Sequence, residues 1–473
     1  MERQFPLNAI SGTRLTEVRA WLNGTLTESK RGIRDVIVSL IPQGVSLCTG
    51  LFTSILVARG LGPAGLGKYA LVLSVSDAAT TLSDLGIGQT AIRYASRAAG
   101  LGDSEEQFAV LRWTFRRRMS LLALIGLMVF VAAPLMAGRI WHMPALAPWI
   151  RLALLIGIFG ALAHVPSIYF QSLKRFHVNS AVLTGQALIS FAGILFLALL
   201  KRWSVESVVL VSIVTAGSGA LVFLTLVPRA ALLSVGSRPF SLTESVKRFW
   251  RAPTLVAIAK DGTVDAEGPN VFAFYMLLSS ILVMLILKAD VWLMGYFLDA
   301  RSVGVYNAAT RLTLPLAVLL AAINTALWPR ASSLVRIEDK VALLRKTFRL
   351  CSMVALAALA YAIGAPHLAP LLFGARYSGS VLLGQLLCIR YLIAILVCPL
   401  GVIGYSLGLV RMYWIVNLIQ LLTVVVINVL LLPRVGPVAS TIALITNEVV
   451  GFVGVGVLIR RKLGAKVQAA SER

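Results

Sequence analysis

Charged side chains interrupt several long apolar runs of this sequence, and these are the residues whose types suit chemistry. Six stand out: Asp77, Asp84, Lys288, Asp290, Arg311 and Arg390. A charge at the centre of a bilayer costs about 2.5–3.5 kcal/mol, so such residues pair, line a cavity or bind a ligand. If the runs are membrane spans, these positions predict where a ligand or an ion binds.

The cations among them suit an anionic ligand, because a guanidinium offers paired donors to phosphate oxygens. Arg59, at the end of the first run, joins the same set. A cation at the end of a run also serves simply as an anchor at the membrane surface, and that alternative stays open for Arg59, Arg93 and Arg330. The candidate binding residues are Arg59, Lys288, Arg311 and Arg390.

The acidic residues Asp77, Asp84 and Asp290 are candidates for coupling transport to an ion, because a buried carboxylate can carry a proton or hold a cation. Asp77 and Asp84 are seven residues apart, hence on one helix face. Asp290 and Arg311 fall at similar depth, so a salt bridge between them is an alternative role for Asp290. A turn cap is the alternative for Asp84. The choice between H⁺ and Na⁺ stays open.

Other reactive residue types give no pattern. The four cysteines lie in apolar runs, with no disulfide or metal spacing. We expect no catalytic residues, no metal and no cofactor, and we interpret His164 and His367 as packed, hydrogen-bonded histidines. Polar residues of the last two runs are expected to bond between helices: Asn417, Gln420, Asn428, Asn447 and Glu448.

The elements that position these residues follow from composition. The 473 residues are 58% hydrophobic and 14% charged, more apolar than a soluble chain can cover. Runs of about 18 apolar residues predict membrane helices. We predict twelve, over residues 35–59, 68–92, 119–137, 148–172, 177–200, 204–228, 271–299, 304–328, 348–373, 379–405, 411–432 and 436–459. The fold class is therefore an all-α polytopic membrane protein. We expect no cleaved signal peptide before the first run.

The net charge of +24 is a topology signal rather than a nucleic-acid surface. Of the 44 Lys and Arg residues, 32 fall on one side of the twelve spans, eight on the other and four within spans. This bias predicts that both termini are cytoplasmic. The outer loops have about ten residues or fewer, which leaves no room for a catalytic domain, so we expect a protein that is not an enzyme.

An internal repeat divides the chain. The stretch "RGLGPAGLGKYA" has a counterpart 237 residues later, with Leu61 on Leu298, Gly67 on Gly304, and Tyr69 on Tyr306. Two six-helix lobes around a central cavity follow, related by an axis along the membrane normal. The Gly-Pro stretch is then a tight outer turn. The predicted segments are an N-terminal segment (1–34), two lobes (35–228 and 271–459), an inter-lobe loop (229–270) and a tail (460–473).

These stretches also resemble a known family. "RGLGPAGLGKYA", "LSDLGIGQTAIRYAS" and "ADVWLMGYFLDARSVGVYNAATRL" are similar to bacterial polysaccharide flippases of the multidrug/oligosaccharidyl-lipid/polysaccharide exporter superfamily. The resemblance implies a multi-pass protein of the inner (cytoplasmic) membrane that works by alternating access. It implies a substrate of sugars on a polyprenyl pyrophosphate carrier, for O-antigen, capsule or secreted exopolysaccharide. The partners implied are this oligosaccharide, membrane lipids and the polysaccharide polymerase machinery, without nucleic acid.

Two other functions were weighed. A multidrug cation antiporter of the same fold is the alternative within transport, although such a site favours free carboxylates over cations. A membrane glycosyltransferase or polymerase is disfavoured by the short outer loops, because acid–base chemistry on sugars needs placed carboxylates or histidines.

Overall fold

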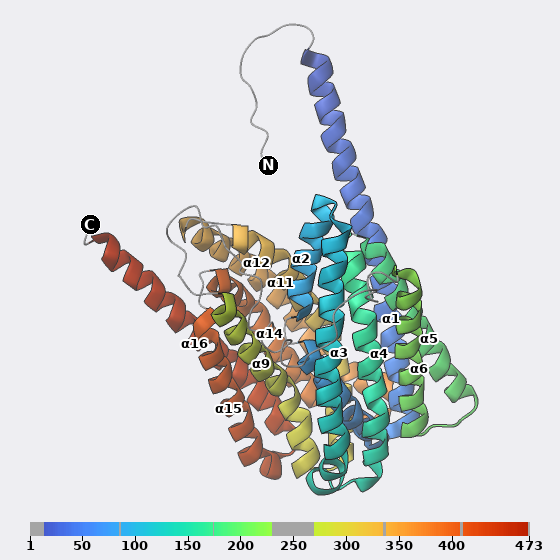
Figure 1. Ribbon diagram of the computed structural model, residues 1–473. Helices are drawn as coiled ribbons and strands as arrows, with labels where there is room; N and C mark the ends of the chain where they lie inside the picture. The colour runs from blue at the N-terminus through green and yellow to red at the C-terminus, as the bar shows by residue number, and fades with distance from the viewer. Residues whose placement is uncertain are drawn as a thin grey trace.

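The computed structural model describes residues 14–84, 87–173, 175–228, 269–333, 337–406 and 410–471, and every regular element in them is helical (Figure 1). The N-terminal half holds α1 (Arg14–Asp84), α2 (Ile87–Leu101), α3 (Ser104–Leu135), η1 (Met136–Ile140), η2 (Pro144–Leu146), α4 (Ala147–Ser172), α5 (Phe176–Leu199) and α6 (Val205–Leu226). The predicted inter-lobe loop lies outside the described residues, except for its last two.

The C-terminal half has the same all-helical character. It holds α9 (Pro269–Phe297), α10 (Ala300–Leu312), α11 (Leu314–Ser333), α12 (Ile337–Gly364), η3 (Ala365–Leu368), α13 (Ala369–Phe373), η4 (Ala375–Tyr377), α14 (Ser380–Ser406), α15 (Val410–Val435) and α16 (Val438–Ser471).

Helix α1 reverses direction at Gly62, as the Gly-Pro stretch predicted. Gly62 is its one non-helical residue, at φ +64° and ψ 177°, a conformation that glycine adopts without a Cβ penalty. Ser46 contacts Thr184 near the start of α5, while Gly60 lies against Trp203 beyond the end of α5. The second leg then returns toward the end where α1 began (Figure 1).

The predicted number of spans agrees with the helices. Within the described residues, ten helices are long and apolar enough to cross a membrane, and α10 with α11, bent by 52°, counts as one further span if the pair crosses together. Pro315 follows that bend, as expected of a residue that lacks a backbone donor. The first of the ten, Gly44–Asp84, contains both legs of α1, and counting each leg separately brings the described residues to the predicted twelve.

One predicted boundary differs from the structure. The predicted spans leave residues 93–118 between them as a loop, but α3 begins at Ser104, ahead of the predicted start of the third span at residue 119. The basic residues of "RWTFRRR" are therefore helical. A cluster of arginines looks like a loop by charge, but arginines are good helix formers and continue the span into the membrane surface.

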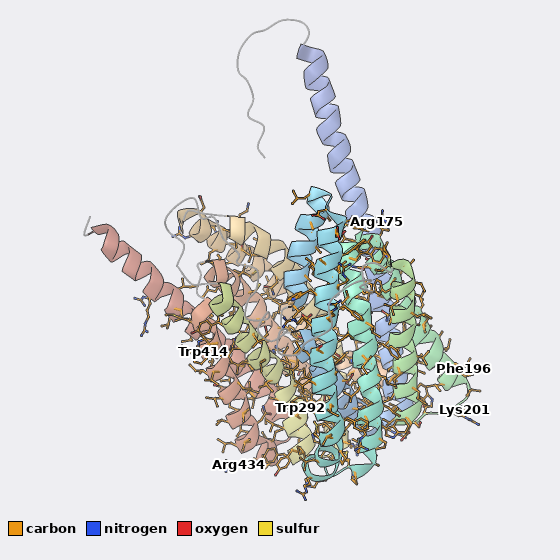
Figure 2. All side chains as sticks on the ribbon, in the orientation of Figure 1. Arg175, Phe196, Lys201, Trp292, Trp414 and Arg434 are labelled. Carbon is orange, nitrogen blue, oxygen red and sulfur yellow. The ribbon has the colours of Figure 1, made fainter. Side chains whose placement is uncertain are left out.

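The two halves stand side by side, with α1–α6 (blue to green) on one side and α9–α16 (yellow to red) on the other (Figure 1). Both termini emerge at the same end, where Arg175 lies, while Lys201 and Arg434 lie at the opposite end (Figure 2). We call these the inner and the outer end, following the predicted topology.

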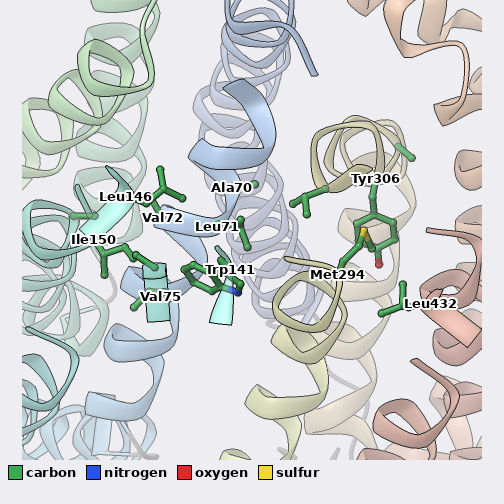
Figure 3. Close-up of a cluster of buried hydrophobic side chains, with 14 of the residues drawn as sticks. Ala70, Leu71, Val72, Val75, Trp141, Leu146, Ile150, Met294, Tyr306 and Leu432 are labelled. Carbon is green, nitrogen blue, oxygen red and sulfur yellow. The ribbon is translucent and has the colours of Figure 1, made fainter. Parts of the chain in front are cut away.

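The halves share one buried core. Leu71 and Val75 of α1 pack with Trp141, and the same cluster includes Met294 and Tyr306 of the second half (Figure 3). Two hydrogen bonds also join the halves in equivalent ways. In each, a side chain that follows the third span of one half (α3 or α12) bonds the first span of the other half (α9 or the first leg of α1). Trp141 Nε1 donates to the carbonyl of Trp292 at 3.3 Å, and the Tyr377 hydroxyl donates to the carbonyl of Ala58 at 2.8 Å.

Candidate functional site

An ion pair also joins the halves. Lys288 Nζ of α9 lies 3.3 Å from Asp77 Oδ2 on the second leg of α1. The lysine side chain is 21% exposed, but the aspartate side chain is 61% exposed although its helix neighbours Ser76 and Ala78 are buried. From the sequence, Lys288 was a candidate for ligand binding and Asp77 a candidate for ion coupling. In the structure the two residues form one ion pair.

Among the described residues, Arg311 has neither a carboxylate partner nor, unlike Arg59, a backbone carbonyl that holds its guanidinium. It lies near the C-terminal end of α10, half-buried, and α10 packs against α1. The Tyr69 hydroxyl of α1 is 2.9 Å from the hydroxyl of Ser212. The charged residues at the boundary of the halves are thus the pair of Lys288 and Asp77, with Arg311 on a helix that packs against α1.

The alternative salt bridge from Asp290 to Arg311 is not formed. Asp290 is buried; Tyr306 donates its hydroxyl to Oδ2, and the Val291 amide donates to Oδ1 at 2.7 Å. Tyr306 and Arg311 are five residues apart, so their side chains diverge by about 140° around α10. The face of α10 that meets Asp290 carries Tyr306, and Arg311 points elsewhere.

Arg390 also has a partner that was not predicted for it. Its Nε lies 3.0 Å from Oε1 of Glu448 on α16, with both side chains less than one fifth exposed. Arg390, Asp290 and Tyr306 line a cavity of about 200 Å³ inside the C-terminal half, and Glu448 lines an adjacent one of about 230 Å³. Arg390 thus belongs to the interior of one half rather than to the boundary of the halves.

Arg59 lies at the outer end, as an anchor would. Its Nε donates to the carbonyl of Leu372 at 2.7 Å and its Nη2 to that of Leu371 at 2.6 Å. These carbonyls belong to the short helix α13 of the other half, so Arg59 ties the halves where Tyr377 also does. The side chains of Arg93 and Arg330 lie outside the described residues.

A buried triad in the N-terminal half was missed from sequence. Arg118 Nη1 lies 2.7 Å from Asp84 Oδ1 and 2.5 Å from His164 Nδ1, and the arginine side chain is 4% exposed. Gly88 N also donates to Asp84 Oδ1 at 3.2 Å, so the expected cap is present as well. The sequence analysis placed Arg118 in the loop between the second and third predicted spans. Because Arg118 is the arginine of the cluster nearest to the apolar run, its position could have indicated that it is buried.

The polar residues of the last spans mostly bond between helices, as predicted. Gln420 donates to the carbonyl of Asn447 at 2.9 Å, and Ser440 donates to Asn428 at 2.6 Å. His367 is hydrogen-bonded to Gln385. Across the described residues, no cluster of three His, Cys, Asp or Glu side chains suits a metal ion.

The charges between the halves therefore leave a positive balance. Among the described residues, Asp77 and Lys288 neutralise each other, and Arg311 adds a cation without a counter-ion. A half-buried guanidinium without a carboxylate is a site for an anionic group that offers several oxygens. The arrangement can bind an anion between the halves.

The fold is that of known transporters. The chain resembles the lipid II flippase MurJ in an inward closed conformation, with a TM-score of 0.65 and 12% identity over 90% of this chain and 87% of that chain. It resembles an inward-facing multidrug resistance MATE family transporter of the MOP superfamily, with a TM-score of 0.57 and 16% identity over 91% and 98%. A variant of the Vibrio cholerae MATE transporter VcmN gives a TM-score of 0.59 and 14% identity over 90% and 96%.

At the level of sequence, no curated protein matches the chain. Residues 33–335 match the family described as polysaccharide biosynthesis protein. This match covers well over half of the 473 residues, and the fold agrees with the flippase resemblance. The chain belongs to the polysaccharide biosynthesis protein family.

Proposed function

We propose that this protein is a flippase for polyprenyl-pyrophosphate-linked oligosaccharides. It moves them from the cytoplasmic to the outer leaflet of the bacterial inner membrane, for the synthesis of a surface or secreted polysaccharide. The two halves alternate in access, and both termini are cytoplasmic.

The observation that carries this proposal is the free cation between the halves. Arg311 has no carboxylate partner among the described residues, whereas Asp77, Asp84 and Glu448 each face a cation. A pyrophosphate would complete the charge balance that the protein leaves open. Its oxygens suit the guanidinium fork, and we assign the second positive charge to Lys288.

Each charged residue then has a separate role. Arg311 and Lys288 hold the pyrophosphate head, while the polyprenyl tail stays in lipid. Arg59 holds the outer ends of the halves together through the carbonyls of α13. Arg390 sets the electrostatics of the C-terminal cavity through Glu448.

Asp290 is the carboxylate that we assign to ion coupling. Neutral donors, the Tyr306 hydroxyl and the Val291 amide, bind it directly, and it borders an internal cavity. Asp77 and Asp84 are already engaged by Lys288 and Arg118. A proton or a cation entering the cavity would meet Asp290 first.

A multidrug cation antiporter is the second candidate. The exposed carboxylate of Asp77 is the observation that favours it, because a cationic drug needs an accessible anion. The positive balance between the halves disfavours it, because a cation would also meet Arg311 and Lys288.

The experiment that separates the two is the sidedness of lipid-linked glycans in cells depleted of this protein. An impermeant reagent labels glycans on the outer face of sealed spheroplasts. We expect glycan-lipid to accumulate facing the cytoplasm. Normal sidedness together with increased sensitivity to cationic dyes would reject the flippase and favour the antiporter.

A further inference from the structure

The exposure of Asp77 is unusual for a residue that closes an ion pair between two halves. Lys288 is mostly covered, while the Asp77 side chain is 61% exposed and meets Lys288 at 3.3 Å. An ion pair with one solvent-facing partner is weak, so its acid is easily exchanged for another anion. The Asp77 carboxylate therefore neutralises Lys288, but few other contacts hold it there.

We propose that Asp77 occupies the place of the substrate's anionic head at Lys288 when the site is empty, and that the arriving pyrophosphate displaces it. This inference rests on the proposed function and adds a regulatory step to the same site. Displacement frees Asp77 from α9, and the direct ionic tie between the halves is lost at the moment of binding.

The balance of charges favours replacement of Asp77 by the pyrophosphate over binding of the pyrophosphate with Asp77 still in place. With Asp77 in place, Lys288 is neutralised and only Arg311 offers a free charge. With Asp77 displaced, Lys288 and Arg311 together match a pyrophosphate that carries two ionised phosphates.

The geometry also explains why the exchange would act on the halves. Asp77 is on the second leg of α1 and Lys288 on α9, so the pair crosses the boundary directly. Of the other polar contacts between the halves among the described residues, Arg59, Trp141 and Tyr377 donate to backbone carbonyls, and Trp292 donates to the Ser74 hydroxyl. The pair of Lys288 and Asp77 is the contact between a cation and a carboxylate, in which an arriving anion would take the place of the carboxylate.

The first test is binding of farnesyl pyrophosphate to the full-length protein in nanodiscs, with farnesol as the uncharged control. The variants are D77N, K288Q and R311Q. D339N is the matched control, because Asp339 is an exposed carboxylate on α12 and its loss changes the net charge equally. We expect D77N to bind about fivefold more tightly than D339N, since the competing ion pair is gone. K288Q and R311Q should bind about tenfold more weakly than wild type.

The outcomes separate this inference from the function on which it rests. If D77N binds no tighter than D339N while K288Q and R311Q weaken binding, the displacement is wrong and the anion site stands. If K288Q and R311Q both bind as wild type does, the anion site fails, and the displacement fails with it.

A second measurement follows the halves themselves. Spin labels at Gly100 of α2 and Lys346 of α12, in a chain whose four native cysteines are serines, report the distance between the inner ends. A Cβ at Gly100 meets no neighbouring atom, so the label is tolerated. Farnesyl pyrophosphate should broaden the distance distribution of the wild type, and D77N should show the broad distribution without ligand. A narrow distribution in D77N that matches the unliganded wild type would overturn the release of the tie.

Discussion

Gly67 and Gly304 face one another where α1 crosses α10, and they are equivalent residues of the internal repeat. A Cβ on Gly67 would lie 1.8 Å from the carbonyl oxygen of Ala300, and one on Gly304 would lie 1.8 Å from that of Pro63. Pro63 and Ala300 are also 237 residues apart. The contact is therefore reciprocal, as at a two-fold axis, and the repeat read from sequence has its axis at this crossing.

This crossing predicts that G67A and G304A each damage the fold. The added methyl meets backbone, which has no rotamer to move away, so the halves must separate. We expect each variant to lose at least about 2 kcal/mol of stability, at the upper part of the usual range for overpacking. Thermal unfolding in detergent measures it.

The control for that prediction is G126A. A Cβ at Gly126 of α3 meets no atom within 4 Å. Alanine there should leave stability unchanged or raise it by up to about 1 kcal/mol through helix propensity. Equal stability of all three variants would show that the two helices do not cross as closely as described.

Arg311 gives the prediction for transport. R311Q should reduce transport of lipid-linked glycan at least tenfold, because one of two cations for the pyrophosphate is lost. R311K should retain part of the activity, since it keeps the charge but not the paired donors. The sidedness assay in cells carrying only the variant measures both.

Arg301, exposed at the outer end of the same helix, supplies the control for that experiment. R301Q removes the same charge from α10 and should transport as the wild type does. A reduction in R301Q equal to that in R311Q would mean that the charge of α10 as a whole matters, rather than the position of Arg311.

Arg118 predicts a loss of stability rather than of binding. R118A leaves Asp84 and His164 without the guanidinium that both contact, so the unpaired charge should cost about 3 kcal/mol. The double variant R118L/D84L should recover much of this, because the two charges leave together. Thermal unfolding of the two variants decides it, and a double variant no more stable than R118A would argue against the ion pair.

The comparison of sequence and structure shows which features were predictable. The apolar runs predicted the spans, and the glycines around Gly62 predicted the reversal of α1. Both features depend on local composition, which a sequence shows directly. Arg118 was missed since its charge was read as topology. The partner of Asp290 was missed because depth in the membrane was counted without the angle around α10, which turns Tyr306 rather than Arg311 toward it.

Equivalent residues of the repeat also differ in their partners, which no sequence comparison within the chain could supply. Tyr69 and Tyr306 are 237 residues apart, yet Tyr69 bonds Ser212 on α6 and Tyr306 bonds Asp290 on α9. The repeat therefore predicts backbone positions better than it predicts polar contacts. Only the packing of neighbouring helices decides which hydroxyl meets which acceptor.

Asp299 predicts an acid-sensitive contribution to stability outside the spans. It caps α10, and its Oδ1 accepts the Ser302 amide at 2.9 Å. A hydrogen bond from the Ser302 side chain lowers the pKa of the Asp299 carboxyl below its ordinary value, with smaller effects from the Ser302 amide and from Arg301. A lowered folded-state pKa means that the ionised cap stabilises the protein above the ordinary pKa and that this contribution is lost as pH falls through the lowered value.

The variants D299A and D299N separate the cap from its charge. D299A should lose about 1 kcal/mol at neutral pH, as for other N-caps, whereas D299N keeps a side-chain acceptor and should lose less. The difference in thermal stability between wild type and D299N should shrink as pH falls below the ordinary range of an aspartate. A difference that stays constant from pH 7 to pH 3 would show that the charge of Asp299 does not contribute.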